Sequence, residues 1–165
     1  MTKKSIAFVT KASLIYALAY LFVGAIAYQL LTKQFYVGDN AIFAIFMRSE
    51  SDQSLWAHVM QWQLPMLFLR SLLIAFVLLP FVTTLKAFSF KKRAAVLFAL
   101  VFVLVHLAAA APSPSNIEGI VYMRPELMSI KAFLLTQPEM IAQSLLFAFG
   151  TAYIIDKQPK QRRVK

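Results

Sequence analysis

Residues 12–31 read ASLIYALAYLFVGAIAYQLL, a run of apolar, small and weakly polar residues without a charged side chain. The hydrocarbon core of a bilayer is about 30 Å thick, and about twenty helical residues cross it. Inside that core every backbone N–H and C=O group needs a partner within the protein, so an isolated crossing segment must be a helix. The stretch therefore predicts a membrane-spanning helix near the start of the chain.

The composition of the whole chain points the same way. Of its 165 residues, 60% are hydrophobic and 15% are charged, with a mean hydropathy of +0.67, whereas soluble domains are about 45–50% apolar and about 25% charged. Three further apolar runs cover residues 64–85, 94–111 and 137–155. We therefore predict an all-α integral membrane protein, a single membrane domain over residues 1–165 with four transmembrane helices.

Several functional classes are excluded by composition. The chain has no cysteine, so disulfides, iron–sulfur clusters and thiol catalysis are ruled out. It has 4 glycines, and none of them forms a Gly-rich phosphate-binding motif. Only two histidines are present, and too few potential ligands share one region for a transition-metal site. We expect no metal and no cofactor.

The positive charges fall on alternate connections between the apolar runs. Most Lys and Arg residues lie in three segments: the N-terminus, the turn at 86–93 and the tail at 156–165. These residues are Lys3, Lys4, Lys11, Lys86, Lys91, Lys92, Arg93, Lys157, Lys160, Arg162, Arg163 and Lys165. The connections 32–63 and 112–136 hold most of the seven acidic residues. Because cytoplasmic segments carry the Lys/Arg excess, this pattern predicts a bacterial inner-membrane protein with both termini in the cytoplasm. The net charge of +10 then reflects topology, so we expect the bilayer as a partner and no nucleic acid.

The N-terminus also permits a second interpretation. Basic residues, an apolar run and the small-residue sequence Ala25-Ile26-Ala27 are typical of a cleavable signal peptide. The apolar run continues beyond this point to Leu31, which is long for a signal sequence. We expect the first span to remain as a membrane anchor.

The two outward connections, 32–63 and 112–136, are expected to contain short interfacial or amphipathic helices. Asp52 can cap a helix that begins with QSLWAHV, since aspartate is a preferred N-cap residue. Trp56 and Trp62 in this segment suit the membrane–water boundary. The segment is expected to lie on the outer leaflet; a lid over an outward cavity is the alternative.

Polar side chains within the apolar runs form the candidate site. Arg70, His106 and Gln143 each lie six residues inside the predicted outer end of their span, which places each about 9 Å below that end. Glu139 lies one helical turn above Gln143, and Gln29 lies near the outer end of the first span. Ionisable groups inside a bilayer are costly and therefore mark functional sites. We call these five residues the polar layer and predict that they line an outward-facing pocket.

Each of these residues has a functional and a structural interpretation. Arg70 can bind an anion, pair with Glu139, or extend its charged end to the membrane surface. His106 can carry a proton or serve as a hydrogen-bonded packing residue, and Gln143 can form an interhelical hydrogen bond. Glu139 also fits a capping box with Thr136, in which it would mark the start of the fourth span. The sequence assigns no catalytic residue.

Two stripes of residues are expected to mediate helix contacts. Ser144, Ala148 and Ala152 have the spacing that lets helix backbones approach closely, and they are the predicted face for a homo-oligomer or a membrane partner. A second stripe on the first span contains Tyr16, Tyr20, Gly24 and Tyr28. It is expected to be a helix contact, with an aromatic lining as the alternative.

The layout resembles that of small four-span proteins of bacterial inner membranes, and the likeness is one of architecture alone. It favours a non-enzymatic accessory, binding or transport-associated component with an outward-facing polar pocket. The alternative is an intramembrane enzyme that acts on a lipid-linked or outer-leaflet substrate, with Arg70 holding a phosphate and His106 acting as an acid or base.

Overall fold

The described chain is helical. A computed structural model of the protein describes residues 2–39, 41–124, 126–127 and 129–157. The described residues are 80% helical, and no strand occurs among them. Three helices are long and apolar enough to cross a membrane, namely Lys3–Phe35, Gln53–Ala87 and Ile130–Asp156. The predicted all-α class is therefore confirmed, and the three long apolar helices support a membrane protein.

The first long helix begins at the polar N-terminus. Its α-helical part, α1 (Lys3–Ala27), is capped by Thr2, whose side chain accepts a hydrogen bond from the backbone N–H of Ser5. The helix continues as a π-helical turn at Tyr28–Thr32 and a 3₁₀ turn at Lys33–Phe35. π-Helical turns are rare and are frequently found at functional sites.

The second long helix starts at the predicted cap. Asp52 accepts hydrogen bonds from the backbone N–H groups of Ser54 and Leu55, at 2.9 and 3.1 Å, and so begins α2 (Gln53–Leu78). A 3₁₀ turn at Leu79–Phe81 then leads into α3 (Val82–Ala87). The segment expected to lie on the outer leaflet is thus continuous with the second span.

The third apolar run forms a helix of the expected length that begins and ends four residues earlier than predicted. It consists of α4 (Phe90–Ala99) and a π-helical stretch at Leu100–Leu107, instead of residues 94–111. The helix starts early because the Ser89 hydroxyl caps it by accepting from the backbone N–H of Lys92. It therefore carries the basic Lys91-Lys92-Arg93 sequence in its first turn, and it is not among the three span-length apolar helices.

Asn116 organises the loop that follows. Its side-chain amide donates to the carbonyl oxygens of Ala109 and Ala111, while its carbonyl oxygen accepts from the N–H groups of Ser113 and Gly119. These bonds start the short helix α5 (Ile117–Tyr122). A Cβ atom on Gly119 would lie 1.8 Å from the Ser113 carbonyl oxygen, so this close approach requires glycine.

The last helix, α6 (Ile130–Asp156), begins earlier than the sequence suggested. Ser129 caps it by accepting from the backbone N–H of Ala132. The predicted capping box is wrong, because Thr136 lies inside the helix and its hydroxyl donates to the Phe133 carbonyl oxygen. The Glu139 carboxylate instead accepts a hydrogen bond from Gln143.

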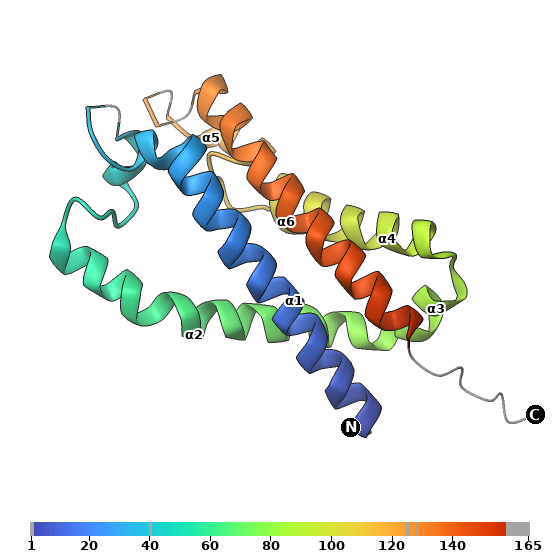
Figure 1. The fold of residues 1–165 in the computed structure, drawn as a ribbon. Coiled ribbons are helices and arrows are strands. Elements are labelled where there is room, and N and C mark those ends of the chain that lie inside the picture. The colour runs from blue at the N-terminus through green and yellow to red at the C-terminus, as the bar shows by residue number, and fades with distance from the viewer. Residues whose placement is uncertain (1, 40, 125, 128, 158–165) are drawn as a thin grey trace, which may run out of the picture.

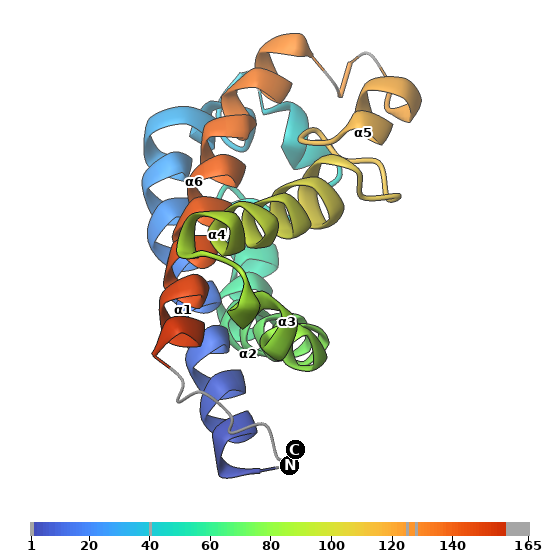
Figure 2. The same cartoon turned by 90° about the vertical axis from the view of Figure 1, so that its right-hand side faces the viewer.

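Helices α1 and α6 form the centre of the molecule. They run antiparallel and pack against each other, with α2 packed on α1 and α4 packed on α6 (Figures 1 and 2). The close approach of α1 and α6 depends on small residues, since a Cβ on Gly150 would lie 2.8 Å from Ile15 Cγ2. The stripe Ser144, Ala148 and Ala152 is fully buried within this packing. It therefore serves contacts inside the chain, and a contact between copies would have to use other residues.

One end of the molecule gathers most of the described basic residues. The N-terminal part of α1, the turn between α3 and α4, and the C-terminal end of α6 lie there (Figure 1). The described cations of this basic end are Lys3, Lys4, Lys11, Lys86, Lys91, Lys92, Arg93 and Lys157. Beyond Lys157 the predicted basic tail lies outside the described residues.

Arg93 fastens the basic end together. Its side chain is 2% exposed, and all five guanidinium N–H groups are used: they reach the carbonyl oxygens of Leu85, Lys86, Phe88 and Ala152 and the carboxylate of Asp156. Three of these acceptors lie at or just beyond the end of α3, where carbonyl groups lack helical partners. Arg93 therefore joins the chain reversal between α3 and α4 to the C-terminal turn of α6.

Candidate polar site within the helices

Arg70 lies on α2 with its guanidinium group over two aromatic rings of α1. The guanidinium carbon is 5.7 Å from the ring centroid of Tyr16 and 5.7 Å from that of Tyr20. A cation over an aromatic ring is attracted by the partial negative charge on the face of the ring. Among the described residues, no carboxylate lies within ion-pair distance of Arg70.

The Tyr16 hydroxyl adds an unpaired polar group to this region. Tyr16 is 4% exposed, and its ring packs edge-on against Phe147 with centroids 5.4 Å apart. Its hydroxyl has no hydrogen-bond partner among the described residues. An unsatisfied buried hydroxyl costs about 1–3 kcal/mol. Such a group in a native protein calls for an explanation, of which a bound water or ligand is one.

Glu139 and Gln143 form the second part of the site on α6. The Gln143 amide nitrogen donates to Glu139 Oε1 at 2.8 Å. These side chains face Gly24 of α1, where an added Cβ would lie 3.4 Å from Glu139 Oε1 and 3.6 Å from Gln143 Nε2. These are ordinary van der Waals distances, so the polar pair of α6 packs against α1 at Gly24 without requiring glycine there.

Tyr20 is influenced by the charges of both parts. The positive charge of Arg70 and the negative charge of Glu139 both act on its hydroxyl. The Glu139 charge also acts on Tyr36, whose burial is the main reason that its pKa rises to about 12. Arg70 and Glu139 therefore approach one tyrosine from different helices without forming an ion pair with each other.

His106 lies near the end of the π-helical stretch Leu100–Leu107 and is 8% exposed. The positive charge of Arg70 also acts on its ring. The described contacts thus join Arg70 to Tyr16 and Tyr20, and Glu139 to Gln143. His106 is linked to them through the charge of Arg70.

Gln29 stands apart from this region. It lies in the π-helical turn Tyr28–Thr32, and its side chain is exposed. Sequence reasoning did not identify Tyr16 and Tyr20 as the partners of Arg70. The signal was present, because these tyrosines are spaced by four residues on one face of α1. The spacing does not indicate which side chain of another helix Tyr16 and Tyr20 contact.

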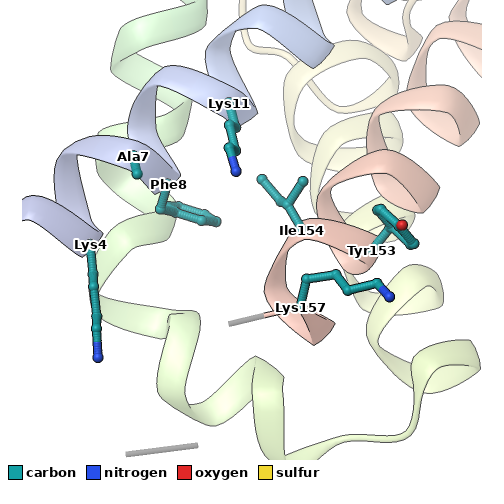
Figure 3. A pocket seen from close by; sticks show the side chains of 7 residues that line it. All are labelled: Lys4, Ala7, Phe8, Lys11, Tyr153, Ile154 and Lys157. Atoms are coloured by element: carbon teal, nitrogen blue, oxygen red, sulfur yellow. The ribbon is translucent and has the colours of Figure 1, made fainter. Parts of the chain in front are cut away.

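The pocket that the structure describes lies at the other end of the bundle. It has a volume of about 270 Å³ and lies between the N-terminal part of α1 and the C-terminal part of α6 (Figure 3). Its lining residues are Lys4, Ala7, Phe8, Lys11, Tyr153, Ile154 and Lys157. We call it the basic pocket; it contains none of the residues predicted for the polar layer.

Comparison with known proteins gives no further assignment. No protein-family model, no curated protein and no solved structure matches this chain. In the part of the chain that the structure describes, no three His, Cys, Asp or Glu side chains lie close enough to hold a metal ion. The functional argument therefore rests on the geometry of the site.

Proposed function

We propose that this chain is a small polytopic protein of a bacterial inner membrane, with four transmembrane helices and both termini in the cytoplasm. In this proposal the helix Phe90–Leu107, the third crossing in chain order, is added to the three long apolar helices. Its ten α-helical and eight π-helical residues extend about 27 Å at the α-helical rise. The orientation is supported by the basic end, which gathers the segments that the positive-inside rule assigns to the cytoplasm.

Within this topology we propose a non-enzymatic binding or transport-associated role, centred on an outward-facing polar layer. The observation that carries the proposal is the environment of Arg70. Its guanidinium lies over Tyr16 and Tyr20 with no described carboxylate in ion-pair contact, and the Tyr16 hydroxyl is buried and unpaired. A guanidinium recognises carboxylate and phosphate groups through paired hydrogen bonds. The proposed ligand is therefore a molecule or lipid headgroup with such an anionic group.

The alternative function is an intramembrane enzyme with a lipid-linked or outer-leaflet substrate. One observation favours it: His106 lies close enough to Arg70 for the arginine charge to act on its ring. Arg70 would then hold a phosphate while His106 transfers a proton. The described contacts of the layer do not place a nucleophile beside these two residues, so binding is the better supported role.

The proposal is tested by identifying what the protein retains when it is extracted from its native membrane in a mild detergent. We expect an anionic compound to co-purify with the wild-type protein and to fall by about tenfold in Arg70→Gln, because the paired, charge-assisted hydrogen bonds are lost. Arg124→Gln is the matched control, since it removes the same charge from an exposed arginine that pairs with Glu126. Mass spectrometry that finds the same anionic compounds on Arg70→Gln as on the wild type would contradict the proposal.

A further inference from the structure

We propose that the basic pocket binds the phosphate headgroup of an anionic phospholipid from the surrounding bilayer. This site is separate from the polar layer and does not depend on the role of Arg70. It lies between α1 and α6 at the basic end, where Figure 3 shows Lys11 extending into the space above Phe8 and Ile154.

The pocket combines positive charge with an apolar wall. Three lysines from two helices line it: Lys4 and Lys11 from α1 and Lys157 at the end of α6. Ala7 and Phe8 lie between the two lysines of α1, and Ala7 is exposed. Phe8 and Ile154 supply the apolar surface. A phospholipid has the same two parts, an anionic phosphate and the apolar start of its acyl chains. Figure 3 shows Lys11 turned into the pocket, whereas Lys4 and Lys157 point away from it and the Lys157 ammonium lies 5.4 Å from the Tyr153 ring centroid. Binding of one phosphate by all three lysines therefore requires Lys4 and Lys157 to change rotamer, which their flexible stems allow.

The volume limits what the pocket can hold. At about 270 Å³ it lies just below the range of ordinary ligand pockets, about 300–1,000 Å³. This suits a headgroup whose acyl chains stay in the bilayer. Tyr153, which also lines the pocket and is largely exposed, is of the residue type enriched at the membrane–water interface.

The protein itself leaves the three lysines without an anionic partner. None of them forms an ion pair among the described residues. The nearest acid in the sequence, Asp156, is bound to Arg93 at 3.2 Å. The first turn of α1 contains no acidic residue, although the positive end of a helix dipole favours a negative charge there.

The chain's own tail is an unsuitable occupant. Residues 158–165 read QPKQRRVK and contain four basic and no acidic residues, so they offer no acidic side chain to the lysines of the pocket. Anionic lipids of the cytoplasmic leaflet attract such a region by about 1 kcal/mol per Lys or Arg. A lipid phosphate is therefore the occupant that both the pocket and its surroundings favour.

The test titrates the purified full-length protein in a neutral detergent with short-chain phosphatidylglycerol, and native mass spectrometry counts the bound lipid. The variant K4Q/K11Q/K157Q removes the three lysines of the pocket. The control K3Q/K91Q/K92Q removes three lysines of the same end that do not line it. We expect the pocket variant to bind at least about tenfold more weakly, as each lysine near a lipid phosphate contributes about a fivefold factor. The control should change binding by less than about twofold.

A second variant separates the shape of the pocket from its charge. Ala7→Trp fills part of the pocket without altering any charge, and because Ala7 is exposed the fold should be retained. It is expected to weaken phosphatidylglycerol binding as well. Equal losses in the two triple variants, with normal binding in Ala7→Trp, would show diffuse surface attraction and overturn the proposal.

The source of the phosphate is tested with two further probes. Phosphatidylcholine, which has a phosphate but no net charge, is expected to bind much more weakly than phosphatidylglycerol. Inorganic phosphate at the same concentration should not displace the bound lipid, because it cannot use the apolar wall. Displacement by inorganic phosphate would show that the pocket takes a soluble anion and would overturn the lipid assignment.

Discussion

Two arginines lie among the helices of this protein, and the protein satisfies them in opposite ways. Arg93 uses all five of its N–H donors on backbone carbonyls and one carboxylate. Arg70 rests on the rings of Tyr16 and Tyr20. The difference follows from position, since Arg93 lies where two helices end and free carbonyls are available. Arg70 lies in mid-helix, where the surrounding carbonyls already accept helical hydrogen bonds.

The two arginines differ in whether their N–H donors are already used within the protein. Arg93 has no donor left for a ligand, so its charge holds the fold together. The rings of Tyr16 and Tyr20 attract the charge of Arg70 but do not accept hydrogen bonds from the N–H groups in the plane of its guanidinium. These N–H groups remain available to a ligand, and the neighbouring Tyr16 hydroxyl has no partner among the described residues. We therefore expect replacement of Arg93 to lower the free energy of unfolding, and replacement of Arg70 to weaken binding of the anionic ligand.

The largest effect is expected for Arg93→Met. Methionine fills part of the volume but removes the guanidinium donor from the carbonyl groups of Leu85, Phe88 and Ala152. Of these, the Leu85 carbonyl still accepts from the Phe88 N–H. We expect a loss of about 3 kcal/mol in the free energy of unfolding, measured by denaturant titration in detergent. A loss below 1 kcal/mol would show that water replaces the guanidinium and would remove the contrast with Arg70.

A smaller but clear loss is expected for Asn116→Ala at the opposite end. The Asn116 side chain makes four hydrogen bonds that organise the loop before α5, and we expect a loss of about 2 kcal/mol. Asn116→Asp keeps the acceptor for two of these bonds and loses the donor for the other two. Because its carboxylate would be buried against the carbonyl oxygens of Ala109 and Ala111, it should lower the stability at least as much as Asn116→Ala in the same titration.

Arg70→Met should have a modest effect on folding. The cation–π contacts that it loses are worth about 1 kcal/mol, and no ion pair is broken. Arg70→Lys should retain part of this stabilisation, since lysine also binds aromatic faces. If Arg70→Met destabilised the protein as strongly as Arg93→Met in the same experiment, Arg70 would be a structural residue.

The carboxylate partner of Arg93 is expected to matter little. Asp156 is 60% exposed and receives only one of the five guanidinium bonds. Asp156→Asn should therefore cost less than about 1 kcal/mol, as exposed ion pairs do. A loss comparable to that of Arg93→Met would mean that the ion pair, and not the carbonyl groups, holds this junction.

The smallest effect is expected from the cap of the helix that carries Arg70. Hydrogen bonds from the Ser54 hydroxyl and from backbone N–H groups lower the pKa of Asp52. A lowered pKa means that the cap stabilises the fold above the ordinary aspartate pKa, and that this contribution disappears as the pH falls through the folded-state value. Asp52→Asn keeps a good N-cap without titrating, so its thermal midpoint should depend less on pH between about 5 and 3. An unchanged pH dependence would contradict this role.

The sequence alone predicts the helical class, the three span-length helices and the Asp52 cap, because each depends on local composition or on neighbouring residues. It places the start of α6 too late, since two caps compete and Ser129 comes first in the chain. The role of Arg93 is hidden in a run of three cations whose charges fit a simple topology rule. Its partners at Leu85 and Ala152 come together only when α3, α4 and α6 meet.

The candidate site shows the same division between local and long-range information. Helical rise and span ends predict that Arg70 and His106 lie at one depth, and the spacing of four residues brings Glu139 to Gln143. The pairing of α1 with both α2 and α6 is a long-range property. Only the folded chain shows that Arg70 lies over Tyr20, that the Glu139 charge also acts on this tyrosine, and that Gln29 is exposed.

The most direct test of the central claim is a crystal structure grown in a lipid phase that contains lipids from the native membrane. The account predicts a non-protein molecule within hydrogen-bonding distance of both the Arg70 guanidinium and the Tyr16 hydroxyl, with the Glu139 carboxylate still bound to Gln143. The contrary result would be an ion pair between Arg70 and Glu139, with the Tyr16 hydroxyl bonded to the protein and no molecule between the helices.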